Sequence, residues 1–152
     1  MKLAEGLSLR ADSQRRLEQV RQRLVRNALV QEGETPAEDP QALLAELERL
    51  ADTLLDLMQR INRTNAATRL DDGASLADAL ALRDVLSARQ KAYAALAEAA
   101  SVSKGRVSRA EVIYRSTVNV PQIQRRADEL ARDHRALDAR IQELNWRTEL
   151  LD

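Results

Sequence analysis

The sequence contains no cysteine, and its 152 residues include only three aromatic side chains. The absence of cysteine excludes disulfide bonds, thiolate metal ligands and a catalytic thiol. The aromatic residues are Tyr93, Tyr114 and Trp146, and there is no phenylalanine. The core must therefore be built from Leu, Ile, Val and Ala.

Long hydrophobic runs are also lacking. No stretch approaches the roughly 18 apolar residues of a membrane-spanning helix. The first residues, "MKLAEGLSLRADSQRR", are amphipathic and charged and lack the apolar stretch of a secretory signal. We therefore expect a soluble, cytoplasmic protein.

The usual enzyme motifs do not occur. With four glycines, the chain has no Gly-rich phosphate loop, and it lacks the G-x-S-x-G, H-E-x-x-H and EF-hand patterns. Its one histidine, His134, follows Ala131 and so lacks the Glu-x-x-His pairing of di-iron bundles. We expect no catalytic residues, no metal and no cofactor, and therefore no enzymatic activity.

Apolar residues recur at steps of three and four over four long segments, which indicates amphipathic helices. The helices are expected at about residues 2–30, 40–70, 75–103 and 120–151. Matched lengths and short turns favour an all-α fold, either an antiparallel four-helix bundle or long helical hairpins. A chain of 152 residues is expected to form a single helical domain over 1–152.

Two of these helices carry regular apolar seams. Leu43, Leu47, Leu50, Leu54, Leu57 and Ile61 step by four and three, as in a coiled coil, and Leu44, Leu55 and Met58 widen that seam towards a bundle. The segment from Val120 to Leu151 repeats the same steps without a slip, with His134 in the seam. Burial of these seams against neighbouring helices is the expected source of stability.

Charge is balanced in total, with 24 basic and 24 acidic residues, but it is unevenly distributed. Residues 2–30 and 104–126 are mainly basic, and residues 31–40 contain acids without a base. Separated charge favours ordered contacts between segments or between chains. Arg10 and Arg21 lie beside the apolar face of the first helix and are expected to pair with carboxylates of other helices.

One segment departs from the helical period. Residues 109–120, "RAEVIYRSTVNV", alternate with period two and are rich in β-branched side chains, which indicates a strand of about ten residues. The strand could pair with its copy in another subunit, or the segment could be an extended crossover. The candidate residues for an oligomer strand or for partner binding are Lys104, Arg106, Arg109, Val112, Tyr114, Arg115 and Val118.

Polar residues replace the expected leucines after Ile61. Asn62, Thr64, Asn65 and Thr68 all lie where the helical seam would continue. A polar residue in a seam costs stability but penalises wrong alignments of helices, so we interpret these residues as specificity positions. A small-ligand pocket and the capping of a neighbouring helix are the alternatives. His134 is expected to be a hydrogen-bonded core residue.

Several stretches together resemble a family of small bacterial proteins labelled septicolysin-like. They are the first forty residues, "INRTNAATRL", "LADALALRDVL", "VSRAEVIYRSTVNV" and "RIQELNWRTELL". The resemblance covers essentially the whole chain and implies an all-helical fold without known catalytic residues. It also implies a pore-forming role, and it directs attention to Asn62, Arg63, Thr64, Asn65, Arg69, Asn145 and Trp146.

The expected function is therefore a non-enzymatic helical-bundle protein that self-associates and serves as a structural or protein-interaction module. A homo-oligomer is the expected assembly, with a further protein partner possible. The alternative is a protein that binds nucleic acid or an anionic membrane through the basic segment 104–126. That alternative includes the pore-forming role.

Overall fold

The part of the chain that the structure describes consists of four helices joined by irregular connections. A computed structural model describes residues 1–102 and 113–152. The helices are α1 (Leu3–Arg26), α2 (Pro40–Ala67), α3 (Leu76–Val102) and α4 (Val120–Arg147). The described residues contain no β-strand, and only isolated bridges join Lys2 to Glu149 and Arg69 to Ser75. The prediction of an all-α fold with four long helices is confirmed.

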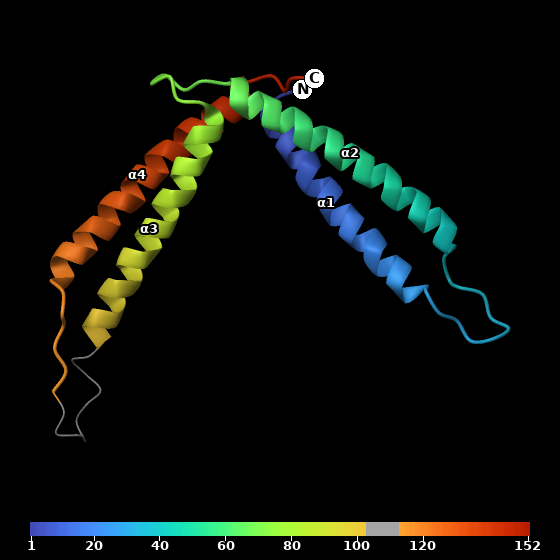
Figure 1. Cartoon of the computed structure of the whole chain (residues 1–152), viewed down its shortest axis with the longest axis horizontal. Coiled ribbons are helices and arrows are strands. Elements are labelled where there is room, and N and C mark those ends of the chain that lie inside the picture. Colours follow the sequence, from blue (N-terminus) through green and yellow to red (C-terminus); the bar gives the residue numbers. More distant parts are fainter. Residues whose placement is uncertain (103–112) are drawn as a thin grey trace. The chain divides into compact units, whose positions relative to one another are not determined.

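Contacts divide the chain into two compact units. The first consists of Met1–Thr68 together with Leu144–Asp152, and the second consists of Arg69–Glu143. The division falls within α4, so this helix contributes residues to both. Figure 1 shows α1 and α2 as one antiparallel helical hairpin, and α3 and α4 as another.

The α1–α2 hairpin forms because its two apolar seams face each other. Val20, Leu43 and Leu50 are the buried centre of this packing, and Leu17, Leu24 and Leu47 pack against them. Asp39 begins α2 by accepting a hydrogen bond from the Gln41 amide, at 3.0 Å, and Pro40 occupies the first turn. These two residues place the start of α2 at the position that the sequence predicts, residue 40.

The first helix ends four residues earlier than the sequence indicates, and Asn27 is the reason. Its side-chain nitrogen donates to the Arg23 carbonyl, at 2.9 Å, and its side-chain oxygen accepts from the Glu38 amide, at 3.1 Å. The same loop is held by Arg23, whose Nε donates to Glu38 Oε2 at 3.0 Å. These bonds turn the chain towards α2 before the apolar pattern of α1 is exhausted.

At its other end, the first unit includes the residues that follow α4. The Leu3 amide donates to the Thr148 carbonyl at 2.9 Å, and the Leu150 amide donates to the Met1 carbonyl at 2.8 Å. Leu150 is buried over Gly6, where an added Cβ would lie 2.9 Å from Leu150 Cδ2. Gly6 thus allows the close approach of this segment to α1.

In the second unit, a tight turn leads into α3. Gly73 has a φ of 86°, which glycine adopts without the strain that a Cβ would cause. Ser75 Oγ accepts a hydrogen bond from the Asp78 amide, at 3.0 Å, and donates to the Asp78 carboxylate, at 2.7 Å. Across the hairpin, Arg83 of α3 pairs with Asp138 of α4, at 2.9 Å.

The segment expected to be a strand or an extended crossover is partly described. Residues 113–119 belong to neither a helix nor a strand within the chain, which agrees with the extended crossover for this part, and pairing between copies stays a prediction. Within it, Ser116 Oγ accepts from the Val118 amide at 3.2 Å, a local turn contact that competes with strand pairing. Lys104, Arg106, Arg109 and Val112 lie outside the described residues. No helix in the described ranges has the length and apolar character needed to cross a membrane.

Candidate functional site

The predicted specificity position Thr64 is completely buried near the end of α2. Its hydroxyl donates to the Arg60 carbonyl at 2.8 Å and accepts from the Leu151 amide at 3.0 Å. One side chain thus completes the hydrogen bonding of two segments that are far apart in the sequence. This geometry anchors the chain that follows α4.

Two arginines of α2 reinforce this anchor. Arg60 Nε donates to the Leu151 carbonyl at 3.0 Å, and Arg63 Nε donates to the Asp152 carbonyl at 2.9 Å. Lys2 adds an ion pair to Glu149, which lowers the pKa of that carboxyl group. The Thr64 region is therefore a clasp between α1, α2 and the residues after α4, and its donors and acceptors are used within the fold.

The predicted positions differ in how far they are exposed. Asn145 is buried and Asn65 is half-buried, whereas Asn62, Arg63 and Arg69 are exposed. Trp146, the single tryptophan, is 64% exposed. His134 is half-buried in α4.

His134 contributes only secondarily to its surroundings. The pKa of Asp138 is lowered mainly by its hydrogen bond to Arg83, with a smaller contribution from His134. No group of three His, Asp or Glu side chains in the described ranges is arranged to hold a metal ion.

The expected pairing of Arg10 and Arg21 with other helices does not occur: Arg10 Nε is buried without a hydrogen-bond partner among the described residues, and it is Arg23 that reaches other segments. Arg23 pairs with Glu38 and lies 3.7 Å from Glu46 of α2. Arg21, in contrast, binds Glu18 of its own helix, at 2.6 Å, and this contact lowers the pKa of Glu18 to about 2. The expected inter-helix pairing of Arg21 is wrong, because a carboxylate one turn away lies within reach.

Apolar side chains also remain exposed along two helices, outside the buried seams. On α2 the exposed residues are Leu44, Leu55 and Met58, and together with the half-buried Ala51 they form what we call the α2 stripe. Its spacing of seven, four and three keeps these residues on one helix face, and Leu55 is 56% exposed. The sequence already indicated this stripe, because Leu44, Leu55 and Met58 widen the apolar seam of α2.

A similar set lies on α3, the α3 stripe: Leu82, Val85, Ala92 and Leu96. Leu82 and Val85 are 52% and 53% exposed. Steps of three, seven and four place them on one face as well. The spacing of apolar residues did not indicate this stripe, because alanines occur on every face of α3.

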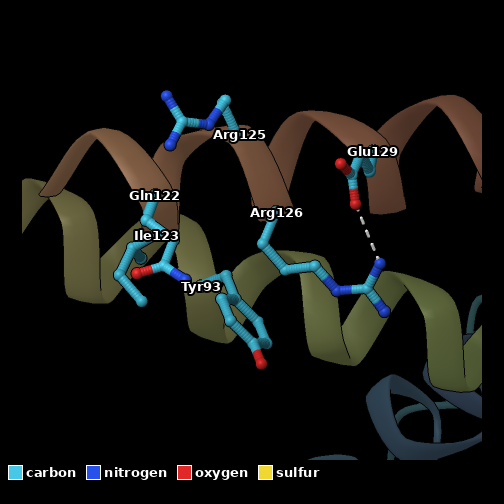
Figure 2. A pocket seen from close by; sticks show the side chains of 6 residues that line it. All are labelled: Tyr93, Gln122, Ile123, Arg125, Arg126 and Glu129. Atoms are coloured by element: carbon cyan, nitrogen blue, oxygen red, sulfur yellow. Dashed lines mark hydrogen bonds and ion pairs between the residues drawn. The ribbon is translucent and has the colours of Figure 1, made fainter. Parts of the chain in front are cut away.

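Between α3 and α4 lies an open pocket of about 550 Å³. Its lining residues are Tyr93, Gln122, Ile123, Arg125, Arg126 and Glu129. Arg126 donates to Glu129 at 3.0 Å, and Figure 2 shows Tyr93 near Arg126, with Arg125 extending away from the Tyr93 ring. The lining of the pocket thus combines the apolar side chains of Tyr93 and Ile123 with the cationic side chains of Arg125 and Arg126.

A second hollow of about 380 Å³ adjoins the first along α4 and shares Arg125 and Glu129 with it. Arg132, Arg135 and Asp128 complete its lining. We call Arg125, Arg132 and Arg135 the α4 arginine row. Sequence reasoning missed these residues because it treated α4 only as an apolar seam.

Comparisons with known proteins place this geometry in a family. Residues 10–150 match the model of DUF6847, a family of unknown function. A crystal structure of a functionally unknown conserved protein from Corynebacterium diphtheriae is 45% identical. It matches over 99% of this chain and 98% of that chain, with a TM-score of 0.95. A search of curated proteins found no match.

These findings correct the family expected from the sequence. The matching model is not a septicolysin-like family, and the solved relative carries no such label. The septicolysin-like resemblance is therefore wrong, and the pore-forming role that it implied loses its basis. The chain belongs to DUF6847, a family of unknown function.

Proposed function

We propose that this protein is a non-enzymatic helical module that self-associates and acts as a structural or protein-interaction element. The observation that supports this proposal most directly is the pair of exposed apolar stripes on α2 and α3. An apolar arc wider than one neighbouring helix can cover is typical of a helix that packs against more than one partner.

The apolar area of the stripes supports association of moderate strength. Six of their side chains are large and about half exposed: Leu44, Leu55, Met58, Leu82, Val85 and Leu96. Burying the exposed area of these six side chains contributes roughly 5–9 kcal/mol to the free energy of association. That gain is comparable to the roughly 4–15 kcal/mol that association costs in lost freedom. The stripes alone therefore roughly offset the cost of association, and polar contacts must supply the surplus that sets the affinity and specificity of self-association.

The proposal is tested by measuring the solution mass with sedimentation equilibrium over a concentration series. The wild-type chain is expected to form oligomers, and Leu55→Glu or Leu82→Glu is expected to shift the mass towards the monomer. Each substitution places a charge in an interface that must exclude water. Circular dichroism of each variant checks that the helices remain.

Leu29→Glu is the matched control. Leu29 is 91% exposed and lies outside both stripes, so the same change of residue type is expected to leave the mass unaltered. A wild-type chain that stays monomeric throughout the concentration series would contradict the proposal. Equal effects of Leu29→Glu and Leu55→Glu would also contradict it.

A further inference from the structure

A row of like charges runs along α2 beside its apolar stripe. Glu48, Asp52 and Asp56 follow one another at steps of four and are all exposed, and we call them the α2 acidic row. Asp56 lies 3.7 Å from Arg60. Glu48 and Asp52 have no ion pair among the described residues. Like charges four residues apart weaken a helix, so this arrangement does not serve the stability of α2 itself.

The α4 arginine row has the opposite charge. Arg125, Arg132 and Arg135 are exposed, and none forms an ion pair within the described ranges. Steps of seven and three place them on the face of α4 that points away from its buried seam. Arg126, in contrast, is neutralised by Glu129. The free cations therefore border the pocket of Figure 2 and the adjoining hollow.

The two rows match in length and in their apolar surroundings. At 1.5 Å per residue, the acidic row extends about 12 Å and the arginine row about 15 Å. The acidic row lies next to Leu55 of the α2 stripe, and Arg125 of the arginine row lines the pocket together with Tyr93 and Ile123. Each surface thus presents charge beside apolar area, and the signs are complementary.

We propose that the α3–α4 groove of one copy receives the acidic edge of α2 of a second copy. This inference rests on the proposed self-association and specifies its surfaces: guanidinium groups of the arginine row pair with carboxylates of the acidic row, and the neighbouring apolar side chains are covered together. Charge complementarity selects the partner surface and its alignment, because a misaligned copy would face unpaired charges.

The test is a charge exchange between copies. One variant carries Glu48→Lys and Asp52→Lys, and the other carries Arg132→Glu and Arg135→Glu. Each variant alone is expected to associate about tenfold or more weakly than the wild type, since like charges then face each other. An equimolar mixture of the two is expected to regain association, because each copy supplies the charge that the other requires.

Two exposed positions outside the rows serve as controls. Glu98→Lys on α3 and Arg16→Glu on α1 each make one charge reversal of the same kind, and they are expected to leave association unaltered. Circular dichroism confirms that every variant keeps its helices. Wild-type association is also expected to weaken as salt rises, because the paired charges are partly exposed.

The outcomes separate this inference from the proposed function. If the wild type associates and both charge variants do so equally well, the assignment of these surfaces is wrong while self-association stands. Failure of the mixture to recover would likewise overturn the pairing. Arginine variants that keep the wild-type mass but lose binding to RNA or to anionic vesicles would assign the row to a polyanion. A wild-type chain that does not associate at all would overturn the proposed function itself.

Discussion

Thr64 shows how one hydroxyl group can connect distant parts of a chain. The side chain donates to its own helix at the Arg60 carbonyl and accepts from the Leu151 amide, 87 residues later. A leucine, which the apolar seam would favour at this position, could do neither. Leu151 lies outside the helices, so its amide has no helical carbonyl to bond, and the Thr64 hydroxyl supplies the acceptor instead.

Replacing Thr64 by valine tests this role. Thr64→Val keeps the shape but removes the acceptor of the Leu151 amide, and we expect a loss of about 1–2 kcal/mol in the free energy of unfolding. Hydrogen exchange at that amide is expected to become faster. Thr64→Ser, the matched control, keeps the hydroxyl and should leave the exchange rate close to that of the wild type. Equal exchange in the valine variant and the wild type would show that the bond contributes nothing.

Trp146 and Asn62 illustrate the limit of residue-level reasoning. Both stand out in the sequence, yet both are exposed in the structure and take no part in the Thr64 clasp. Rarity of a residue type does not indicate burial, because accessibility depends on which other segments cover the residue.

At the scale of the helices, the sequence predicted where helices start more accurately than where they end. Asp39 and Pro40 begin α2, and Ser75 begins α3, as their residue types predict. The ends of α1 and α4 come earlier than the apolar period indicates, at Arg26 and Arg147. In both cases a tertiary contact redirects the chain: the Asn27 bonds at the first, and the Thr148 and Leu150 backbone bonds at the second.

The cap of α2 gives a direct prediction at this scale. Asp39→Ala removes the acceptor of the Gln41 amide and is expected to reduce the free energy of unfolding by about 1 kcal/mol. Asp39→Asn keeps a side-chain oxygen and is expected to retain most of the stability. Urea unfolding of both variants provides the measurement. Equal stability of the alanine and asparagine variants would show that the cap is unimportant.

At the scale of the whole molecule, ion pairs join elements within each unit. Glu38 pairs with Arg23 and Glu149 with Lys2 in the first unit, and in the second Asp138 pairs with Arg83 and Asp72 with Arg140. In each case the cation lowers the pKa of the carboxyl group below its ordinary value. The folded chain therefore holds these groups ionised more strongly than the unfolded chain does.

This difference predicts how stability depends on pH. Because the folded pKa values are depressed, the stabilisation is fully present above the unfolded values of 4.5 for Glu and 3.8 for Asp, and it is lost as the pH falls through the lower folded values. The urea midpoint is expected to decrease steadily between about pH 5 and pH 3. High salt should weaken this dependence, since the pairs are exposed. A midpoint that rises on acidification would contradict it.

Periodicity and capping residues in the sequence by themselves determined the all-α class, the four helices and most of their starting points, because these depend on side chains a few positions apart. Only the tertiary structure decided which apolar residues stay exposed as the α2 and α3 stripes, and that Thr64 meets Leu151. It also placed Tyr93 beside Arg126. Burial and hydrogen-bond partnership depend on segments that approach from far along the chain, and no local pattern records that approach.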